Sequence, residues 1–129
     1  MQDERRRCDR IQWLKFESKV FVRRSLFKKE WIPVVPYDFS HYGMSIQTDE
    51  VYELGDQVCL ALELTQDAGA IAIPLIRGII RYKEKHHSRF NYGVEFTFES
   101  KTEKIALDDD LIRIEQALRR YEASRVVMN

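Results

Sequence analysis

The chain has 129 residues, of which 44% are hydrophobic and 33% are charged, a composition typical of one globular domain that buries its own core. Its 21 Lys and Arg residues balance 21 Asp and Glu residues, and zero net charge argues against binding of long nucleic acid. The longest apolar run, residues 68–80, contains two glycines, a proline and an arginine. It is too interrupted for a spanning helix, so we expect no membrane insertion.

The cysteine pattern and the start of the chain predict a cytoplasmic protein. The two cysteines are Cys8, in an arginine-rich segment, and Cys59, in an apolar run. They do not form a disulfide framework and are expected to be reduced. The apolar residues that follow the basic start are interrupted by polar ones, which is not typical of a secretory signal.

A polar arm over residues 1–12 precedes sequence that is typical of strands. Beyond it, β-branched and aromatic residues are enriched and short stretches alternate apolar with polar side chains. Strands are predicted over residues 14–22, 31–35, 43–48, 58–64, 71–82 and 90–98. The fifth of these is one strand or two, because Pro74 and Gly78 can break or bend it. Residues 83–89 are expected to form a charged connection, and five to seven short strands indicate a small antiparallel barrel or sandwich.

The C-terminal part changes to a helical period. Apolar residues recur at steps of three and four and share one helical face, namely Leu107, Leu111, Ile114, Leu118 and Tyr121. The acidic run at 108–110 can cap the N-terminus, and Ser100-x-x-Glu103 fits a capping box for an earlier turn. Packing on its own domain is favoured over docking a partner. The predicted divisions are an arm at 1–12, a β domain at 13–99 and a helical segment at 100–129.

Two short motifs point to an anionic ligand. Arg6 and Arg10 form R-x-x-x-R within a stretch, residues 1–30, that holds ten basic and five acidic side chains. A guanidinium offers parallel donors that match phosphate oxygens or the O6/N7 edge of guanine. Alone, such a cluster is more often a solvated charge run or a nucleic-acid arm.

The second motif, D-x-S-x-x-G, consists of Asp38, Ser40 and Gly43. A carboxylate can accept hydrogen bonds from the N1–H and N2–H edge of guanine, and a hydroxyl can donate or accept at short range. Glycine lets the backbone turn into a strand and approach a flat ligand closely. Alone, this string is more often an ordinary turn that enters a strand.

The two motifs, in this order and followed by a strand-like sequence that ends at residues 92–96, resemble the PilZ domain. That family binds the bacterial second messenger cyclic di-GMP. The resemblance implies a mainly β fold, a six-stranded antiparallel barrel with a C-terminal α-helix and a flexible N-terminal arginine arm. It also implies that Arg6 and Arg10 contact phosphate and guanine.

The resemblance implies roles for further residues. Asp38, Ser40 and Gly43 would lie at the guanine and ribose. Arg7 would assist, and Arg5, directly before the first motif arginine, favours an intercalated pair of ligand molecules over one. Arg81 is expected near the ligand, with Arg77 as the register alternative.

The resulting hypothesis is a cyclic di-GMP receptor that signals to an unidentified protein partner in motility or biofilm control. The first alternative is a PilZ-like adaptor of a motility or pilus assembly that binds no ligand. The second is a small β-barrel nucleic-acid-binding module. No catalytic constellation, cofactor site or metal spacing is recognisable, and the three histidines are expected to be solvent-exposed loop residues.

Overall fold

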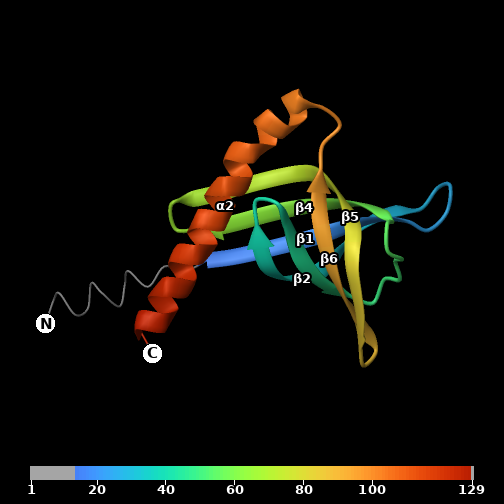
Figure 1. Cartoon of the computed structure of the whole chain (residues 1–129), viewed down its shortest axis with the longest axis horizontal. Helices are drawn as coiled ribbons and strands as arrows, with labels where there is room; N and C mark the ends of the chain where they lie inside the picture. The colour runs from blue at the N-terminus through green and yellow to red at the C-terminus, as the bar shows by residue number, and fades with distance from the viewer. Residues whose placement is uncertain (1–13, 129) are drawn as a thin grey trace, which may run out of the picture.

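The computed structural model describes residues 14–128, with side chains described for residues 14–123. The described chain forms a mainly β domain of six strands and one helix (Figure 1). In chain order these are β1 (Leu14–Arg23), β2 (Lys29–Ser40), β3 (Gly43–Thr48), β4 (Gln57–Gln66), β5 (Gly69–His86), β6 (Arg89–Thr97) and α2 (Lys101–Met128). The arm at 1–12 lies outside the described residues.

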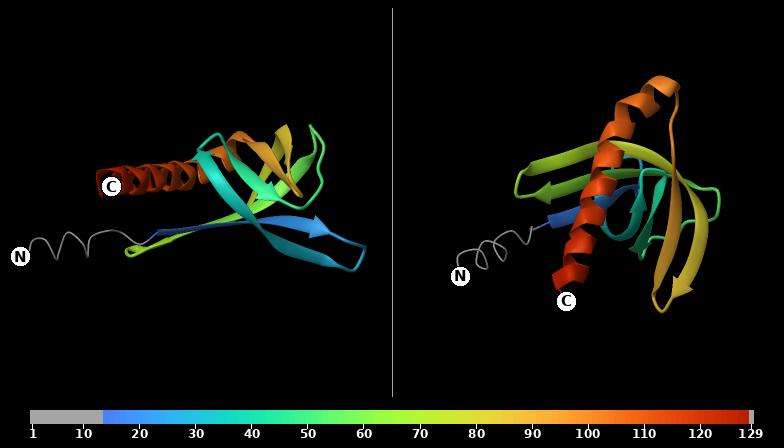
Figure 2. Two further views of the ribbon diagram at one scale, coloured as in Figure 1. Left: turned by 90° about the horizontal axis from the view of Figure 1, so that it is seen from below. Right: turned by 60° about the vertical axis from the view of Figure 1, so that its left-hand side comes forward.

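The six strands form one antiparallel sheet in the order β1-β2-β3-β6-β5-β4, and β4 pairs back with β1. The sheet therefore closes on itself, which leaves no unpaired edge along the ring. Figure 2 shows the sheet curving round with the helix along one side. The prediction of a mainly β fold with six antiparallel strands and a C-terminal helix is confirmed.

The core consists of the inward-facing side chains of the strands. Alternate residues of β3, β4 and β6 are buried, as expected for strands with one covered face. The largest fully buried side chains of the sheet are Val20, Ile46, Leu60, Leu62, Leu64, Ile73, Ile76, Ile80 and Tyr92. Burial of these apolar groups is the main driving force for closure of the sheet.

The helix α2 is part of this core. It packs against β2 and β5, and Leu111, Ile114 and Ala117 on its inner face are buried with the strand residues. The helix begins at Lys101, where the backbone N–H of Glu103 donates to Ser100 Oγ at 3.1 Å. No helix within the described range has the length and apolar character needed to cross a membrane.

Two local predictions are wrong. The acidic run 108–110 lies inside α2 and does not cap it, because the Ser100 cap starts the helix earlier. The predicted connection at 83–89 shrinks to residues 87–88. β5 continues to His86 and β6 begins at Arg89, since charged side chains stay solvated along a hairpin whose backbone ladder is intact. Of the two forms left open for the fifth strand, the structure shows the single one: β5 is continuous, and the extra residue near Pro74 is absorbed as a register shift against β4.

A substitution pair tests whether α2 belongs to the core of its own domain. Leu111 is buried, whereas Ile112, one residue further along the same helix, is exposed. We expect Leu111→Ala to lower the free energy of unfolding by about 2–5 kcal/mol, because it leaves a cavity in the core. Urea unfolding should show a much smaller loss for Ile112→Ala, and equal losses would mean that α2 does not pack on its own sheet in solution.

Candidate functional site

The D-x-S-x-x-G residues lie on the β2–β3 hairpin, where the chain reverses over His41 and Tyr42. Ser40 pairs with Gly43 across the hairpin, and the Tyr42 backbone N–H donates to Ser40 Oγ at 3.1 Å. This bond fixes the short turn in the way expected of a serine at that position. The motif therefore builds a hairpin end and leaves the Asp38 side chain exposed.

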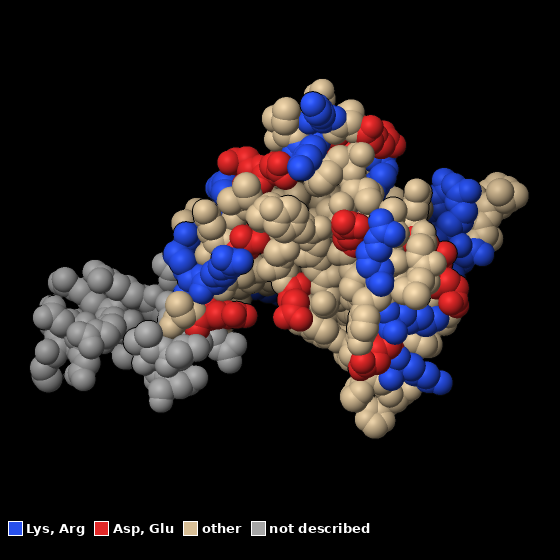
Figure 3. All heavy atoms as spheres, viewed as in Figure 1, with Lys and Arg blue, Asp and Glu red and all other residues tan. Residues whose placement is uncertain are grey.

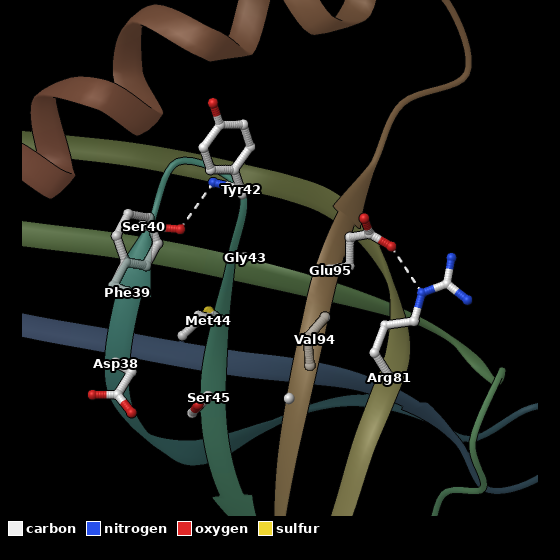
Figure 4. Close-up of a pocket in the computed structure, with 11 residues that line it drawn as sticks. Asp38, Phe39, Ser40, Tyr42, Gly43, Met44, Ser45, Arg81, Val94 and Glu95 are labelled. Atoms are coloured by element: carbon white, nitrogen blue, oxygen red, sulfur yellow. Dashed lines mark hydrogen bonds and ion pairs between the residues drawn. The ribbon is translucent and has the colours of Figure 1, made fainter.

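An open pocket of about 560 Å³ lies beside this hairpin. One wall comes from β2 and β3 and includes Asp38, Ser40 and Gly43, and the opposite wall comes from β5 and β6 and includes Arg81 and Glu95 (Figure 4). The remaining lining residues are Phe39, Tyr42, Met44, Ser45, Gly93 and Val94. Residues separated by about forty positions in sequence thus face one hollow.

Gly43 is required by the close approach of β3 to β6. A Cβ atom at this position would lie 2.2 Å from the Val94 carbonyl oxygen and 3.2 Å from Glu95 Cα. Backbone atoms in a paired strand cannot shift as the end of a side chain can. The carbonyl oxygen of neighbouring Tyr42 also accepts a hydrogen bond from the Phe96 N–H at 2.9 Å. The glycine of the motif therefore serves the sheet, and it lines the pocket through its backbone.

Irregular pairing occurs on both sides of the pocket. The β2–β3 register shifts between Pro36 and Phe39, which places an extra residue near Asp38. The β5–β6 register shifts between Ile80 and Tyr82, which leaves Arg81 as the extra residue. Bulges turn side chains away from the regular alternation and are common beside functional sites. Asp38 is exposed although it shares the parity of buried Val34, so the shift turns it outward, whereas Arg81 follows buried Ile80 and is outward by ordinary alternation.

Arg81 forms an ion pair across the β5–β6 ladder, with its Nε 2.8 Å from Glu95 Oε1 (Figure 4). Both side chains are more than half exposed, so water screens the pair and its strength is modest. Arg77, the register alternative, does not line this pocket. It contacts Glu103 at 3.2 Å and Glu99 at 3.4 Å, and thereby ties β5 to the start of α2.

The hairpin end is attached to α2 through Glu115. Glu115 Oε1 accepts a hydrogen bond from the His41 backbone N–H at 2.7 Å and lies 3.1 Å from His41 Nδ1. Arg119, one turn later in the helix, lies 3.7 Å from Glu115 Oε2. Glu115 is a buried charged residue of the core side of α2, so these contacts supply the partners that a buried carboxylate requires.

These contacts set the protonation of Glu115. Burial by itself raises the pKa of the carboxyl, but the hydrogen bonds from His41 and the charge of Arg119 outweigh it. The pKa is held below its ordinary value of 4.5. The expectation that all histidines are solvent-exposed is therefore wrong for His41, which is partly buried against Glu115, whereas His86 and His87 are exposed.

A second pocket, of about 620 Å³, adjoins the first. Asp38 and Phe39 line both pockets, and the second also includes Leu14 and Arg119. Leu14 is the first described residue, so the chain enters the described fold at this pocket. The phenyl ring of Phe39 packs edge-on against Phe16 at a centroid distance of 5.3 Å, a contact that joins β1 to the strand shared by the two pockets.

The sequence-predicted residues divide into two groups. Asp38, Ser40, Gly43 and Arg81 come together at one pocket. The others, Arg5, Arg6, Arg7 and Arg10, lie outside the described residues. Among residues 14–123 no group of three or more His, Cys, Asp or Glu side chains is arranged to hold a metal ion.

Sequence reasoning missed Glu95 and Glu115. Glu95 sits at an outward position of a strand whose pattern was recognised, but its pairing with Arg81 depends on the β5–β6 register, which sets Glu95 opposite Ile79 and which the sequence does not reveal. Glu115 lies one residue beyond Ile114 on the apolar face of the helix. A carboxylate at a buried position of the helix could have identified Glu115, because a buried charged group requires hydrogen-bond or ion-pair partners.

A comparison with protein-family models matches the PilZ domain to residues 4–113. The matched range covers most of the chain and includes both motifs. The chain belongs to the PilZ family. PilZ domains form a cyclic di-GMP-binding family and are generally binding or adaptor modules rather than enzymes. A search of curated proteins and a search of solved structures each found no match.

A glycine substitution tests the close approach of β3 and β6 in this PilZ domain. We expect Gly43→Ala to lower the free energy of unfolding by about 1–3 kcal/mol, because the new methyl group meets the Val94 carbonyl and the strands must separate. Ser45→Ala, two residues along the same strand, should change stability little. Unaltered urea unfolding of Gly43→Ala would show that β3 can move away from β6 at no cost.

A pH series tests the attachment of the hairpin to α2. Because folding lowers the pKa of Glu115, its ionised carboxylate adds stability above pH 4.5, and this contribution is lost as pH falls through the lowered pKa. We expect Glu115→Gln to be less stable than wild type by about 1 kcal/mol at neutral pH. The difference should shrink as pH is lowered below 4.5.

The control for the pH series is Glu122→Gln, a change at an exposed carboxylate of the same helix. Its unfolding free energy should follow that of wild type at every pH. A constant difference between wild type and Glu115→Gln over the whole series would show that ionisation of Glu115 does not stabilise the fold.

Proposed function

We propose that this PilZ domain is a cyclic di-GMP receptor that holds the dinucleotide between its N-terminal arginines and the pocket beside the β2–β3 hairpin. The observation that carries the proposal is the grouping of Asp38, Ser40 and Gly43 along one wall of that pocket. The exposed Asp38 carboxylate suits the N1–H and N2–H edge of guanine, and the Ser40 hydroxyl suits a ribose or phosphate oxygen. Gly43 keeps this wall in place.

The charge of the pocket supports a role for the arm. Among the lining residues, Asp38 and Glu95 are acidic and Arg81 is basic, and Arg81 already faces Glu95. A ligand with two phosphodiester charges therefore needs further cations. Arg6 and Arg10 supply them in this proposal, since guanidinium groups bind phosphate oxygens and the guanine O6/N7 edge with paired donors.

The length of the arm is compatible with this arrangement. Arg10 lies four residues and Arg6 eight residues before Leu14, so an extended chain spans at most about 14 Å and about 28 Å from it. Leu14 and Asp38 line the same second pocket, and Asp38 also lines the first. Both motif arginines can therefore reach a ligand beside Asp38.

Arg7 assists binding in this proposal, and Arg5 favours an intercalated pair of ligand molecules by stacking on a base. No other cofactor is required. The ligand state passes to an unidentified protein partner in the cytoplasm, in motility or biofilm control. The link from His41 to Glu115 supports a route for this signal, because any shift of the hairpin strains a bond to α2.

Calorimetry with cyclic di-GMP tests the arginine assignment. We expect Arg6→Ala and Arg10→Ala each to weaken binding by about 2 kcal/mol or more, roughly 30-fold, because each removes charge-assisted bonds to the ligand. The matched control is Arg113→Ala, at an exposed helix arginine that forms an ion pair with Asp110 and does not line the pocket. A stoichiometry of two ligands per chain would support the pair.

Two outcomes would contradict the receptor proposal. Unchanged affinity in both arm variants would remove Arg6 and Arg10 from the site. Absence of binding by folded wild-type protein at high ligand concentration would favour the ligand-independent adaptor.

A carboxylate substitution tests how the pocket treats Arg81. In the ligand-free domain the Arg81 guanidinium is paired with Glu95. A phosphate of the ligand must therefore compete with the Glu95 carboxylate for Arg81. We expect Glu95→Gln to tighten cyclic di-GMP binding about two- to fivefold, the scale of an exposed ion pair, and Arg81→Ala to weaken it. Calorimetry on the double variant should match Arg81→Ala alone. Weaker binding by Glu95→Gln would instead make Glu95 a ligand contact.

A further inference from the structure

The β1–β2 hairpin ends in a turn that projects from the body of the domain (Figures 1 and 2). Leu26 and Phe27 occupy this turn and are 78% and 97% exposed. A single exposed apolar side chain needs no explanation, but neighbouring ones that form a patch rimmed by polar residues are a feature of interaction surfaces. The cyclic di-GMP proposal makes no use of this turn.

The turn is ordered by its own hydrogen bonds. The Arg24 backbone N–H donates to the Lys28 carbonyl oxygen at 2.8 Å, and the Phe27 and Lys28 N–H groups donate to Ser25 Oγ at 3.4 Å and 3.1 Å. Arg24 also reaches back to Glu50, with Nη2 3.0 Å from Oε2. The backbone and Ser25 thus hold the turn in a shape that directs Leu26 and Phe27 outward, away from the body of the domain.

Basic side chains surround the apolar tip. Arg23 pairs with Lys29 across the hairpin, Lys28 follows the turn, and Figure 3 shows Lys and Arg atoms gathered over this end of the molecule. Within residues 14–123 no ion pair occupies Arg23, Lys28 or Lys29. These three charges are therefore available to an anionic surface at no cost in broken contacts.

An aromatic pair lies next along the hairpin. Phe21 and Trp31 are paired residues of β1 and β2, and their rings meet edge-on at a centroid distance of 5.3 Å. Trp31 is 39% exposed. From the tip inward, the hairpin thus presents an apolar turn, the cations Arg23, Lys28 and Lys29 (unpaired within residues 14–123) beside an Arg24–Glu30 ion pair, and a partly exposed tryptophan. This order matches the boundary between lipid chains and headgroups, where amphipathic aromatic rings and cations gather.

We propose that the β1–β2 hairpin docks this domain peripherally on an anionic lipid surface. Leu26 and Phe27 enter the boundary between headgroups and acyl chains, while Arg23, Lys28 and Lys29 bind lipid phosphates. A lipid surface fits better than an acidic peptide, because the tip is convex and needs a surface that deforms around it. The contact involves one turn of the chain and does not cross the lipid layer. The pocket beside Asp38 lies on a different part of the sheet.

Sedimentation with vesicles tests this proposal on the full chain. Wild-type protein should bind vesicles of phosphatidylcholine and phosphatidylglycerol at 7:3, but not pure phosphatidylcholine, and added salt should weaken binding. Leu26→Ser with Phe27→Ser should reduce partitioning at least tenfold, because two apolar side chains no longer leave water. Lys28→Gln and Lys29→Gln should each reduce it roughly fivefold.

Matched controls separate the tip from the rest of the chain. Ile105→Ser removes an apolar side chain of α2 that is 74% exposed, and Lys101→Gln removes an exposed cation of the same helix. Both should bind vesicles as wild type does. The N-terminal arginines can also attract anionic lipid, so the deciding variants change the tip alone. Circular dichroism and urea unfolding should show that the tip variants fold normally, as expected for exposed positions.

A fluorescent variant adds a direct measure of depth. Phe27→Trp should bind vesicles with 30% phosphatidylglycerol. When these vesicles are added, its tryptophan emission should shift to the blue by more than that of wild type, because the new indole leaves water. Failure of wild type to bind these vesicles, or equal binding by the tip double variant, would overturn the proposal. A tip-dependent dimer in sedimentation velocity without lipid would also overturn it, since a second copy of the chain would then be the occupant.

Discussion

The pairing of β3 with β6 is the contact on which the rest of the domain depends. It joins the first three strands of the chain to the last three, and it is close enough at Gly43 to exclude even a methyl group. Together with the β1–β4 pairing it closes the sheet around the apolar core. It also brings the hairpin that carries Asp38 and Ser40 against the strand that carries Glu95. The apolar core, the closure of the sheet and the candidate site thus all depend on the pairing of β3 with β6.

Much of the fold follows from patterns that are local in sequence. The alternation in residues 43–48 and the three- and four-residue steps from Leu107 predict β3 and the inner face of α2, because burial imposes those periods directly. The errors came where a local rule met a competing one. Three consecutive aspartates suggested a helix start, but the serine cap at Ser100 acts earlier. Charged residues suggested a loop at 83–89, although a solvated hairpin tolerates charge on its exposed positions.

The candidate site was predictable only in part. Asp38, Ser40 and Gly43 form a recognisable string before a predicted strand, but β2 runs on to Ser40, beyond its predicted end at residue 35, and makes the string part of a hairpin. The opposite wall depends on the β5–β6 register, which a bulge at Arg81 shifts by one residue. No local pattern fixes that register, so Arg77 stayed open as the alternative to Arg81 and Glu95 was not identified. The structure separates the two arginines, one at the pocket and one at the helix start.

The bond between His41 and Glu115 has a consequence for how this chain can vary. The shorter of the two contacts uses the backbone N–H of residue 41 and not its ring. Every amino acid except proline carries that donor. The residue in the turn could therefore change widely across related sequences while the hairpin stayed fastened to the helix. If this bond is retained, Glu115 must be kept on α2, whereas position 41 needs only to avoid proline.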